Sequence, residues 1–137
     1  MQILFAWDAS AEPDESMAVQ IAQEAAPDDV DVRLRGLEWA NGAWSTRQVI
    51  DAQLERLAPQ WPPRRQPAVD RNILRLAVWE LGSTGTPPKV VIDEAIELAK
   101  QYSTENSPSF INGVLDSVLR EHQQITGTEA RRHEGTE

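Results

Sequence analysis

Residues 69–119 constrain the fold most, because they hold three helical hydrophobic patterns joined by two short loops. In each pattern, apolar residues recur three and four positions apart, which is the spacing of a buried helix face. Glycines at 82 and 85 end the first pattern, since Gly readily adopts the left-handed conformation that follows many helices. A capping residue followed by proline then begins each of the other two, at 86–87 and 107–108. This region is therefore expected to form three packed helices, with Ile96 and Leu115 in the core.

The first half of the chain has weaker helical patterns, and no segment alternates as a strand would. We predict a helix over 1–8, a short one over 17–25 and a longer one from about 31 to 58, which Gly42 weakens and can break. Four prolines between 59 and 67 then prevent helix formation.

These elements predict an all-α fold of two small helical bundles packed on each other. A chain of 137 residues is long enough for one domain. We place that domain at 1–123, with an N-terminal subdomain at 1–60 and a C-terminal subdomain at 68–123. Residues 124–137 are polar and are expected to be a disordered tail.

The charge of the chain is unevenly distributed. Its net charge of −9 argues against a general nucleic-acid binder. However, residues 1–46 carry −7, whereas residues 47–75 carry +3 and include six arginines. This basic segment could meet a phosphate backbone, or its arginines could pair with local acids, and the sequence leaves both open.

Two further features leave alternatives open. The five tryptophans could stack on bases, but positions in the core or between subdomains are the simpler expectation. Gly113 lies inside the last predicted helix, where Gly is unfavourable. We expect another helix to approach it closely, and a nearby partner or RNA backbone is the second explanation.

Motifs for catalysis are missing from the sequence. It has no cysteine, no Gly-rich phosphate loop, no zinc-ligand spacing and no nucleophile motif. We therefore expect no enzymatic activity, no metal site, no cofactor and no small-molecule substrate. No apolar run approaches membrane-spanning length, so we expect a cytoplasmic protein that does not bind membranes.

Two long segments resemble a known family. Residues 61–81 (WPPRRQPAVDRNILRLAVWEL) and 91–116 (VIDEAIELAKQYSTENSPSFINGVLD) are similar to the middle and the C-terminal signature of NusB transcription antitermination proteins. Residues 5–8 (FAWD) match the end of the family's first helix. The resemblance implies two three-helix bundles and a non-enzymatic RNA-binding factor.

The same resemblance implies partners. Family members pair with the small-subunit ribosomal protein NusE, and the pair binds boxA elements of nascent rRNA. This complex helps RNA polymerase to read through terminators, so contact with the elongation complex is expected to be indirect. The alternative is a protein-only helical interaction module of the same fold, with weak or lost RNA binding.

Individual residues can be assigned where they match the family. Asp70 stands at an acidic position on the face associated with the ribosomal protein. Asn106 stands where Asp is common in the family, and Asn would not repel phosphate as Asp would. An ordinary loop residue before Ser107, without a role in RNA binding, explains Asn106 equally well. The expected RNA-binding residues are the family matches and the arginines of the basic segment: Phe5, Asn106, Phe110, Arg64, Arg65 and Arg71.

The N-terminus departs from the family pattern. Family members begin with an arginine-rich segment that leads into the first helix, whereas this sequence starts at Met1-Gln-Ile-Leu. No capping residue precedes the first predicted helix, which would leave backbone N–H groups unsatisfied. We therefore expect the native protein to begin upstream of Met1 with a segment rich in arginine. The alternative is a divergent member of the family that has lost part of its RNA contacts.

Overall fold

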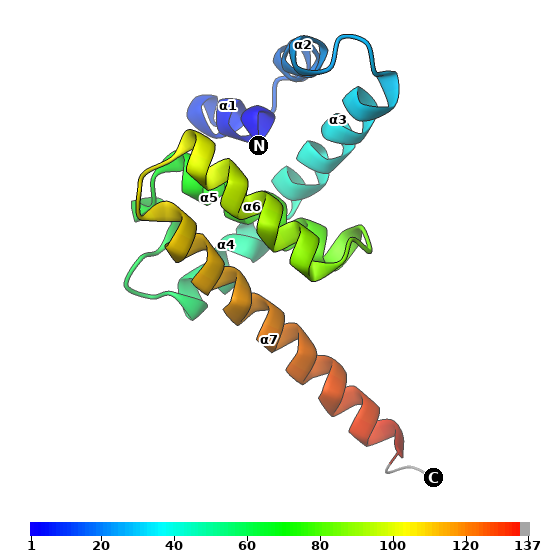
Figure 1. Cartoon of the computed structure of the whole chain (residues 1–137), viewed down its shortest axis with the longest axis vertical. Helices are drawn as coiled ribbons and strands as arrows, with labels where there is room; N and C mark the ends of the chain where they lie inside the picture. The colour runs from blue at the N-terminus through cyan, green and yellow to red at the C-terminus, as the bar shows by residue number, and fades with distance from the viewer. Residues whose placement is uncertain (135–137) are drawn as a thin grey trace.

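Residues 1–134 are described by a computed structural model, and every regular element in this range is helical (Figure 1). The all-α prediction is therefore confirmed. No helix in the described range combines the length and the hydropathy that crossing a membrane requires. The elements are α1 (Gln2–Ser10), α2 (Glu15–Ala25), α3 (Val30–Ser45), α4 (Arg47–Leu57), the 3-10 turn η1 (Pro63–Arg65), α5 (Ala68–Ser83), α6 (Pro88–Tyr102) and α7 (Ser107–Glu134).

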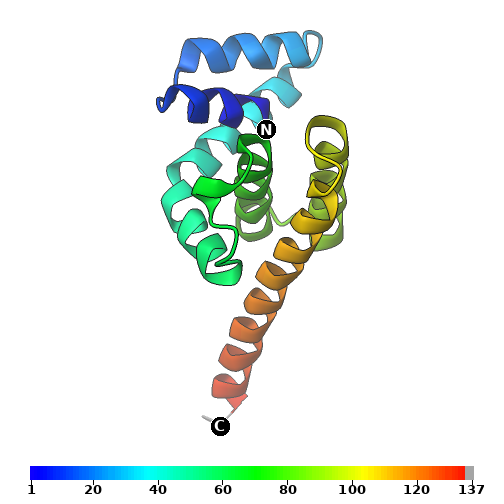
Figure 2. The same cartoon turned by 90° about the vertical axis from the view of Figure 1, so that its left-hand side faces the viewer.

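The buried apolar residues form two clusters. One cluster joins α1, α2 and α3, which lie together at one end of the molecule (Figure 2). The other joins α4, α5, α6 and α7. The helices of the described range thus divide as three and four, and α4 contributes Ile50 and Leu54 to the second cluster although we had assigned it to the N-terminal subdomain. Helix α5 connects the clusters, because Leu76 and Trp79 pack against the first one.

The break between α3 and α4 falls at Thr46 rather than at Gly42. Thr46 ends α3 and its hydroxyl donates a hydrogen bond to the Gly42 carbonyl oxygen at 2.9 Å. Arg47 Nη1 donates to the Trp44 carbonyl oxygen at 2.8 Å, and its guanidinium lies 4.0 Å from the centre of the Trp44 ring. These contacts satisfy carbonyl groups that the end of a helix leaves without partners. The break therefore depends on side-chain contacts that helical periodicity does not reveal.

Gly42 serves close packing instead. A Cβ atom at this position would lie 2.3 Å from ring atoms of Trp79 on α5, far inside van der Waals contact. The rings of Trp39 and Trp79 also meet, with centroids 6.2 Å apart. Glycine thus allows α3 and α5 to approach each other, which places the N-terminal helices against the rest of the molecule.

We predict that Gly42→Ala lowers the free energy of unfolding by about 1–3 kcal/mol, because the added methyl overpacks the contact with Trp79. Gly36→Ala is the matched control in the same helix, since nothing lies within 4 Å of its Cβ position. That change should stabilise the helix by up to about 1 kcal/mol. Urea denaturation of both variants measures the difference. Similar shifts of the same sign would show that Gly42 has no packing role.

The second cluster tests the predictions about the C-terminal helices. Leu115 is fully buried, as predicted, whereas Ile96 is only partly buried at the edge of the cluster. Gly113 has nothing within 4 Å of its Cβ position and is exposed, so the predicted close approach of another helix is wrong. A position on the outer face of α7 explains why no helix meets it.

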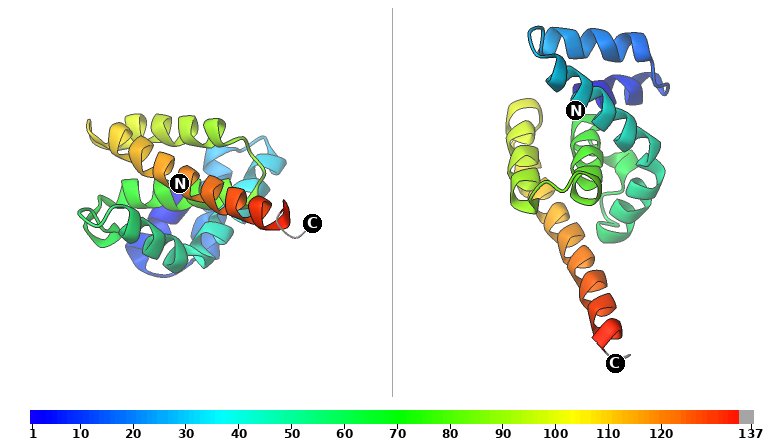
Figure 3. Two further views of the ribbon diagram at one scale, coloured as in Figure 1. Left: turned by 90° about the horizontal axis from the view of Figure 1, so that it is seen from below. Right: turned by 90° about the vertical axis from the view of Figure 1, so that its right-hand side faces the viewer.

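Helix α7 continues to Glu134 and projects from the body of the molecule (Figure 3). This differs from the disordered tail that we predicted from residue 124 onwards. No proline follows residue 108, and the segment contains several Glu, Gln, Ala and Arg residues, which favour helix. The last part of the predicted tail, residues 135–137, lies outside the described residues.

Candidate nucleic-acid interface

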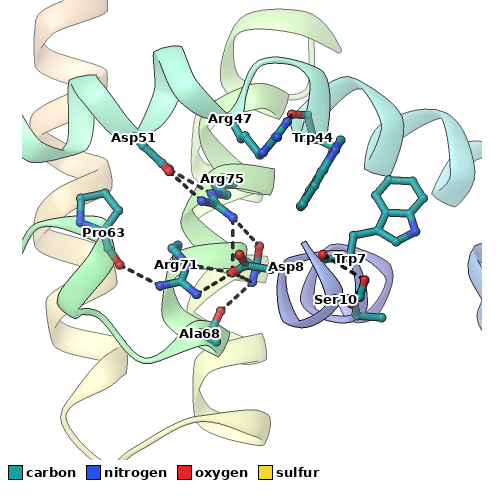
Figure 4. Close-up of polar contacts among 12 residues, drawn as sticks. Trp7, Asp8, Ser10, Trp44, Arg47, Asp51, Pro63, Ala68, Arg71 and Arg75 are labelled. Carbon is teal, nitrogen blue, oxygen red and sulfur yellow. Dashed lines mark hydrogen bonds and ion pairs between the residues drawn. The ribbon is translucent and has the colours of Figure 1, made fainter. Parts of the chain in front are cut away.

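A polar network attaches α5 to α1 and α4 (Figure 4). Arg71 donates to Asp8 Oδ2 through Nε at 2.8 Å, and its Nη2 lies 2.6 Å from the same oxygen. Asn72 Nδ2 donates to that oxygen at 2.9 Å. On the other side, Arg75 forms two hydrogen bonds with the Asp51 carboxylate, at 2.9 and 2.6 Å. The network therefore joins α1 and α4 to the N-terminal half of α5.

The network explains the acidity of Asp8 and the role of Arg71. Burial alone would raise the pKa of Asp8, but hydrogen bonds from Arg71 and Asn72, with the charges of both arginines, lower that pKa below its usual value. Arg71 also donates through Nη1 to the Pro63 carbonyl oxygen at 3.0 Å. Its side chain is thus bonded inside the molecule, and the expected contact of Arg71 with RNA stays a prediction.

The other arginines of the basic segment differ in how they are paired. Arg47 covers the Trp44 ring, and Arg56 lies 2.6 Å from Glu121. Arg64 approaches Glu55 at 3.5 Å, but both side chains are largely exposed, so this pair is weak. Arg65 is exposed, and among the described side chains no carboxylate lies within ion-pairing distance of it. The patch available to a phosphate therefore reduces to Arg64 and Arg65.

Asp70 is buried, with only 3% of its surface exposed. Its two carboxylate oxygens accept hydrogen bonds from the hydroxyls of Ser103 and Ser107, the latter at 2.8 Å. Ser107 thus binds the start of α5, whereas we had expected it to cap α7. Its carboxylate therefore fixes the connection between α6 and α7, and the expected position of Asp70 on the partner face stays a prediction.

A surface pocket of about 380 Å³ lies beside that connection. It lies between the linker that follows α4 and the start of α7. Three of the predicted RNA-binding residues meet here, namely Arg65, Asn106 and Phe110, with Asp70 at the base. Phe5 is 40% exposed on α1 and is not part of the lining. The complete lining is Trp61, Arg65, Gln66, Pro67, Asp70, Thr104, Asn106, Ser107 and Phe110.

Sequence reasoning missed two residues of this pocket. Trp61 is 55% exposed, although we expected most tryptophans to be buried. Gln66 is 5% exposed, and its Nε2 donates to the Trp61 carbonyl oxygen at 3.0 Å. The signal for Trp61 was its place among prolines, because an aromatic residue in a segment that cannot form a helix has no helical core face to join.

A larger hollow of about 920 Å³ lies between the N-terminal helices and α5 and α6. Its charged lining residues are three acids, Glu24, Glu80 and Glu94, and one base, Arg33. Burial, the larger cause, and the charge of Glu94 together raise the pKa of Glu80 to about 7, against a lowering by the amino terminus. The smaller pocket near Arg65 has no exposed acid among its lining residues, so it is the better candidate for RNA.

This chain is similar to known sequences of one family. A sequence model of the NusB family matches residues 1–120. A protein of Solibacter usitatus named transcription antitermination protein NusB is 42% identical over 132 residues, covering 96% of this chain and 90% of the relative. A protein of the same name from a Roseiflexus species is 40% identical over 128 residues, covering 90% and 89%.

Solved structures show the same similarity in three dimensions. T. maritima NusB superposes with a TM-score of 0.77 at 36% identity, over 88% of this chain and 84% of that one. NusB from Aquifex aeolicus superposes with a TM-score of 0.76 at 26% identity, over 90% and 84%.

Proposed function

The chain belongs to the NusB family of transcription antitermination proteins, and from this premise we propose that it binds boxA-type single-stranded RNA together with the ribosomal protein NusE. In this proposal the chain is a cytoplasmic, non-enzymatic adaptor. It reaches the RNA polymerase elongation complex indirectly, through the RNA and the ribosomal protein. The observation that carries the proposal is the pocket that brings Arg65, Asn106 and Phe110 together.

The chemistry of this surface suits single-stranded RNA. Proteins bind unpaired bases by stacking them on aromatic rings and by pairing phosphates with arginine. Phe110 offers the ring, and Arg64 and Arg65 offer the charge. Asn106 is exposed and uncharged, and the one acid of the pocket, Asp70, is turned inward onto two serines. The pocket lining thus presents one cation, Arg65, without an exposed carboxylate.

The charge of the whole chain supports the need for a partner. With a net charge of −9, the molecule repels phosphate at long range, and two exposed arginines contribute little against it. A partner that carries positive charge would offset this repulsion and add its own phosphate contacts. The face that receives the ribosomal protein is proposed to lie near Asp70, whose buried carboxylate would act by holding the connection between α6 and α7 in place.

RNA affinity measured by fluorescence anisotropy, with and without the ribosomal protein, tests the proposal. We expect weak binding by the chain alone and much tighter binding by the pair, with affinity that falls as salt rises. Binding of the ribosomal protein without any gain in RNA affinity would overturn the RNA role and leave the protein-only module.

We predict that Arg65→Glu weakens RNA binding by the pair about 5- to 20-fold at ~0.1 M salt, with a salt dependence shallower by about 0.7 in log–log slope. The physical reason is the loss of a phosphate contact at an arginine without an acidic partner among the described residues. Arg35→Glu makes the same charge change on an exposed position of α3 and serves as the control. Equal losses in both variants would mean that only the net charge matters.

A further inference from the structure

Four of the five tryptophans are used inside the fold, and Trp61 is the exception. Trp7 and Trp44 are buried and meet edge to face, with ring centroids 5.8 Å apart. Trp39 and Trp79 form the second ring pair, between α3 and α5. Trp61 is more than half exposed and lines the pocket beside the α6–α7 connection. An exposed indole of this size needs an explanation, because burying it elsewhere would stabilise the fold.

The backbone around Trp61 is fixed. Its N–H donates to the Ala58 carbonyl oxygen at 3.0 Å, and its own carbonyl oxygen accepts from Gln66 Nε2 at 3.0 Å. The next two residues, Pro62 and Pro63, are buried and restrict the backbone further. The indole is therefore attached to a rigid turn. Ligand binding to the indole would cost the protein little conformational entropy.

The pocket between the rings suits a flat molecule with polar edges. Phe110 lines it from α7, and the two rings are not among the ring pairs in contact within the described residues. A volume of about 380 Å³ is within the range of small-ligand pockets. Arg65 and Asn106 supply hydrogen-bonding groups at the same site.

Gln66 adds a second indication of a ligand. Its amide is nine-tenths buried and is oriented by the hydrogen bond from Nε2 to Trp61. Its Oε1 atom has no hydrogen-bond partner among the described residues. A buried acceptor without a donor is unfavourable, and an N–H group in the pocket would satisfy it after a small movement of the Gln66 side chain toward the ligand. Every RNA base carries such a donor on an edge, whereas an apolar side chain of a protein partner does not.

We infer that this pocket is a subsite for one unpaired RNA base, in which Trp61 is the stacking surface and Gln66 positions it. The inference rests on the proposed RNA binding and adds to it a residue and a ligand class. Base stacking on an aromatic ring is sequence-tolerant, so this subsite would strengthen binding at one nucleotide without strict selection of its base.

The test combines a protein variant with a modified RNA. We compare wild type, Trp61→Leu and Trp61→Phe, each with the ribosomal protein, on a boxA-type RNA oligonucleotide in which one nucleotide at a time is made abasic. Trp61→Leu should bind the intact RNA about 5- to 150-fold more weakly, the range that loss of one stacked base produces. Trp61→Phe should retain most of the affinity, because it keeps an aromatic ring. Circular dichroism checks that both variants fold.

The abasic series gives a readout that a structural defect would not produce. For the wild-type protein, removing the base at one position of the RNA should weaken binding about as much as Trp61→Leu does. For the Trp61→Leu variant, removing that same base should weaken binding almost no further. If every abasic position weakened binding equally in wild type and in Trp61→Leu, the proposed base subsite would be wrong. Weaker binding of Trp61→Leu to the ribosomal protein in the absence of RNA would also overturn the subsite, since it would make the pocket a protein-binding surface. If wild type binds no RNA with its partner, the proposed function fails first and the subsite fails with it.

Discussion

Asp70→Lys is expected to lower the free energy of unfolding by about 3–5 kcal/mol, because it places a positive charge in a buried site without an acidic partner. The two serine hydroxyls that now donate to the carboxylate would also lose their acceptor. Both serines belong to the connection between α6 and α7, so this connection should loosen. RNA affinity should fall as well, since Asn106 lies in the same connection and Phe110 follows it.

Urea denaturation measures the loss of stability, and two variants serve as controls. Asp93→Lys makes the same charge change at an exposed position of α6 and should change stability by less than about 0.5 kcal/mol. Asp70→Asn keeps an acceptor for one serine and should lie between wild type and Asp70→Lys. If Asp70→Lys remains as stable as wild type and loses only partner binding, Asp70 acts at the surface. Its buried hydrogen bonds would then not contribute to the free energy of unfolding.

Asp8→Ala should cost about 3 kcal/mol of folding free energy, because it removes the carboxylate that joins α1 to α5. Arg71 would keep only its bond to the Pro63 carbonyl, whereas Arg75 would retain Asp51. The variant should therefore loosen the N-terminal helices while α5 stays attached to α4. Glu12→Ala removes an exposed acid from the loop after α1 and is the control.

The effect of Asp8 should depend on pH. Its pKa in the folded protein lies below the usual value of about 3.9, so the carboxylate stabilises the fold fully above that pH. The stabilisation is lost as pH falls through the lowered pKa, and the difference between wild type and Asp8→Ala should shrink there. Denaturation curves of both proteins between about pH 2.5 and 7 measure this. A difference that does not change with pH would show that the ionised carboxylate is not what stabilises the interface.

The helices of residues 69–119 could be predicted because their signals are local. Apolar spacing, glycine ends and proline starts lie within a few positions of each other, and α5, α6 and α7 formed close to the expected places. The break at Thr46 and the role of Gly42 could not be predicted in this way. The break depends on side-chain bonds to carbonyl groups, which apolar spacing does not report, and Gly42 meets Trp79, which lies on another helix 37 positions away in the sequence.

The candidate site was predicted only in part, for the same reason. Arg65, Asn106 and Phe110 do lie around one pocket, as their shared assignment to RNA implied. The internal bonds of Arg71 and Asp70 could not be predicted, because their partners are distant in the sequence: Asp8 lies 63 residues from Arg71, and Ser103 lies 33 residues from Asp70. A charged residue beside a motif does not reveal whether its partner is RNA or the protein's own interior.

Ultraviolet crosslinking of boxA-type RNA to the chain in complex with the ribosomal protein, mapped by mass spectrometry, tests the central claim most directly. If RNA binds in the pocket, crosslinks are expected in the linker around Trp61 and Arg65 and in the segment from Asn106 to Phe110. Crosslinks confined to the acidic helices α2 and α3, or none to this chain while the ribosomal protein is labelled, would contradict it.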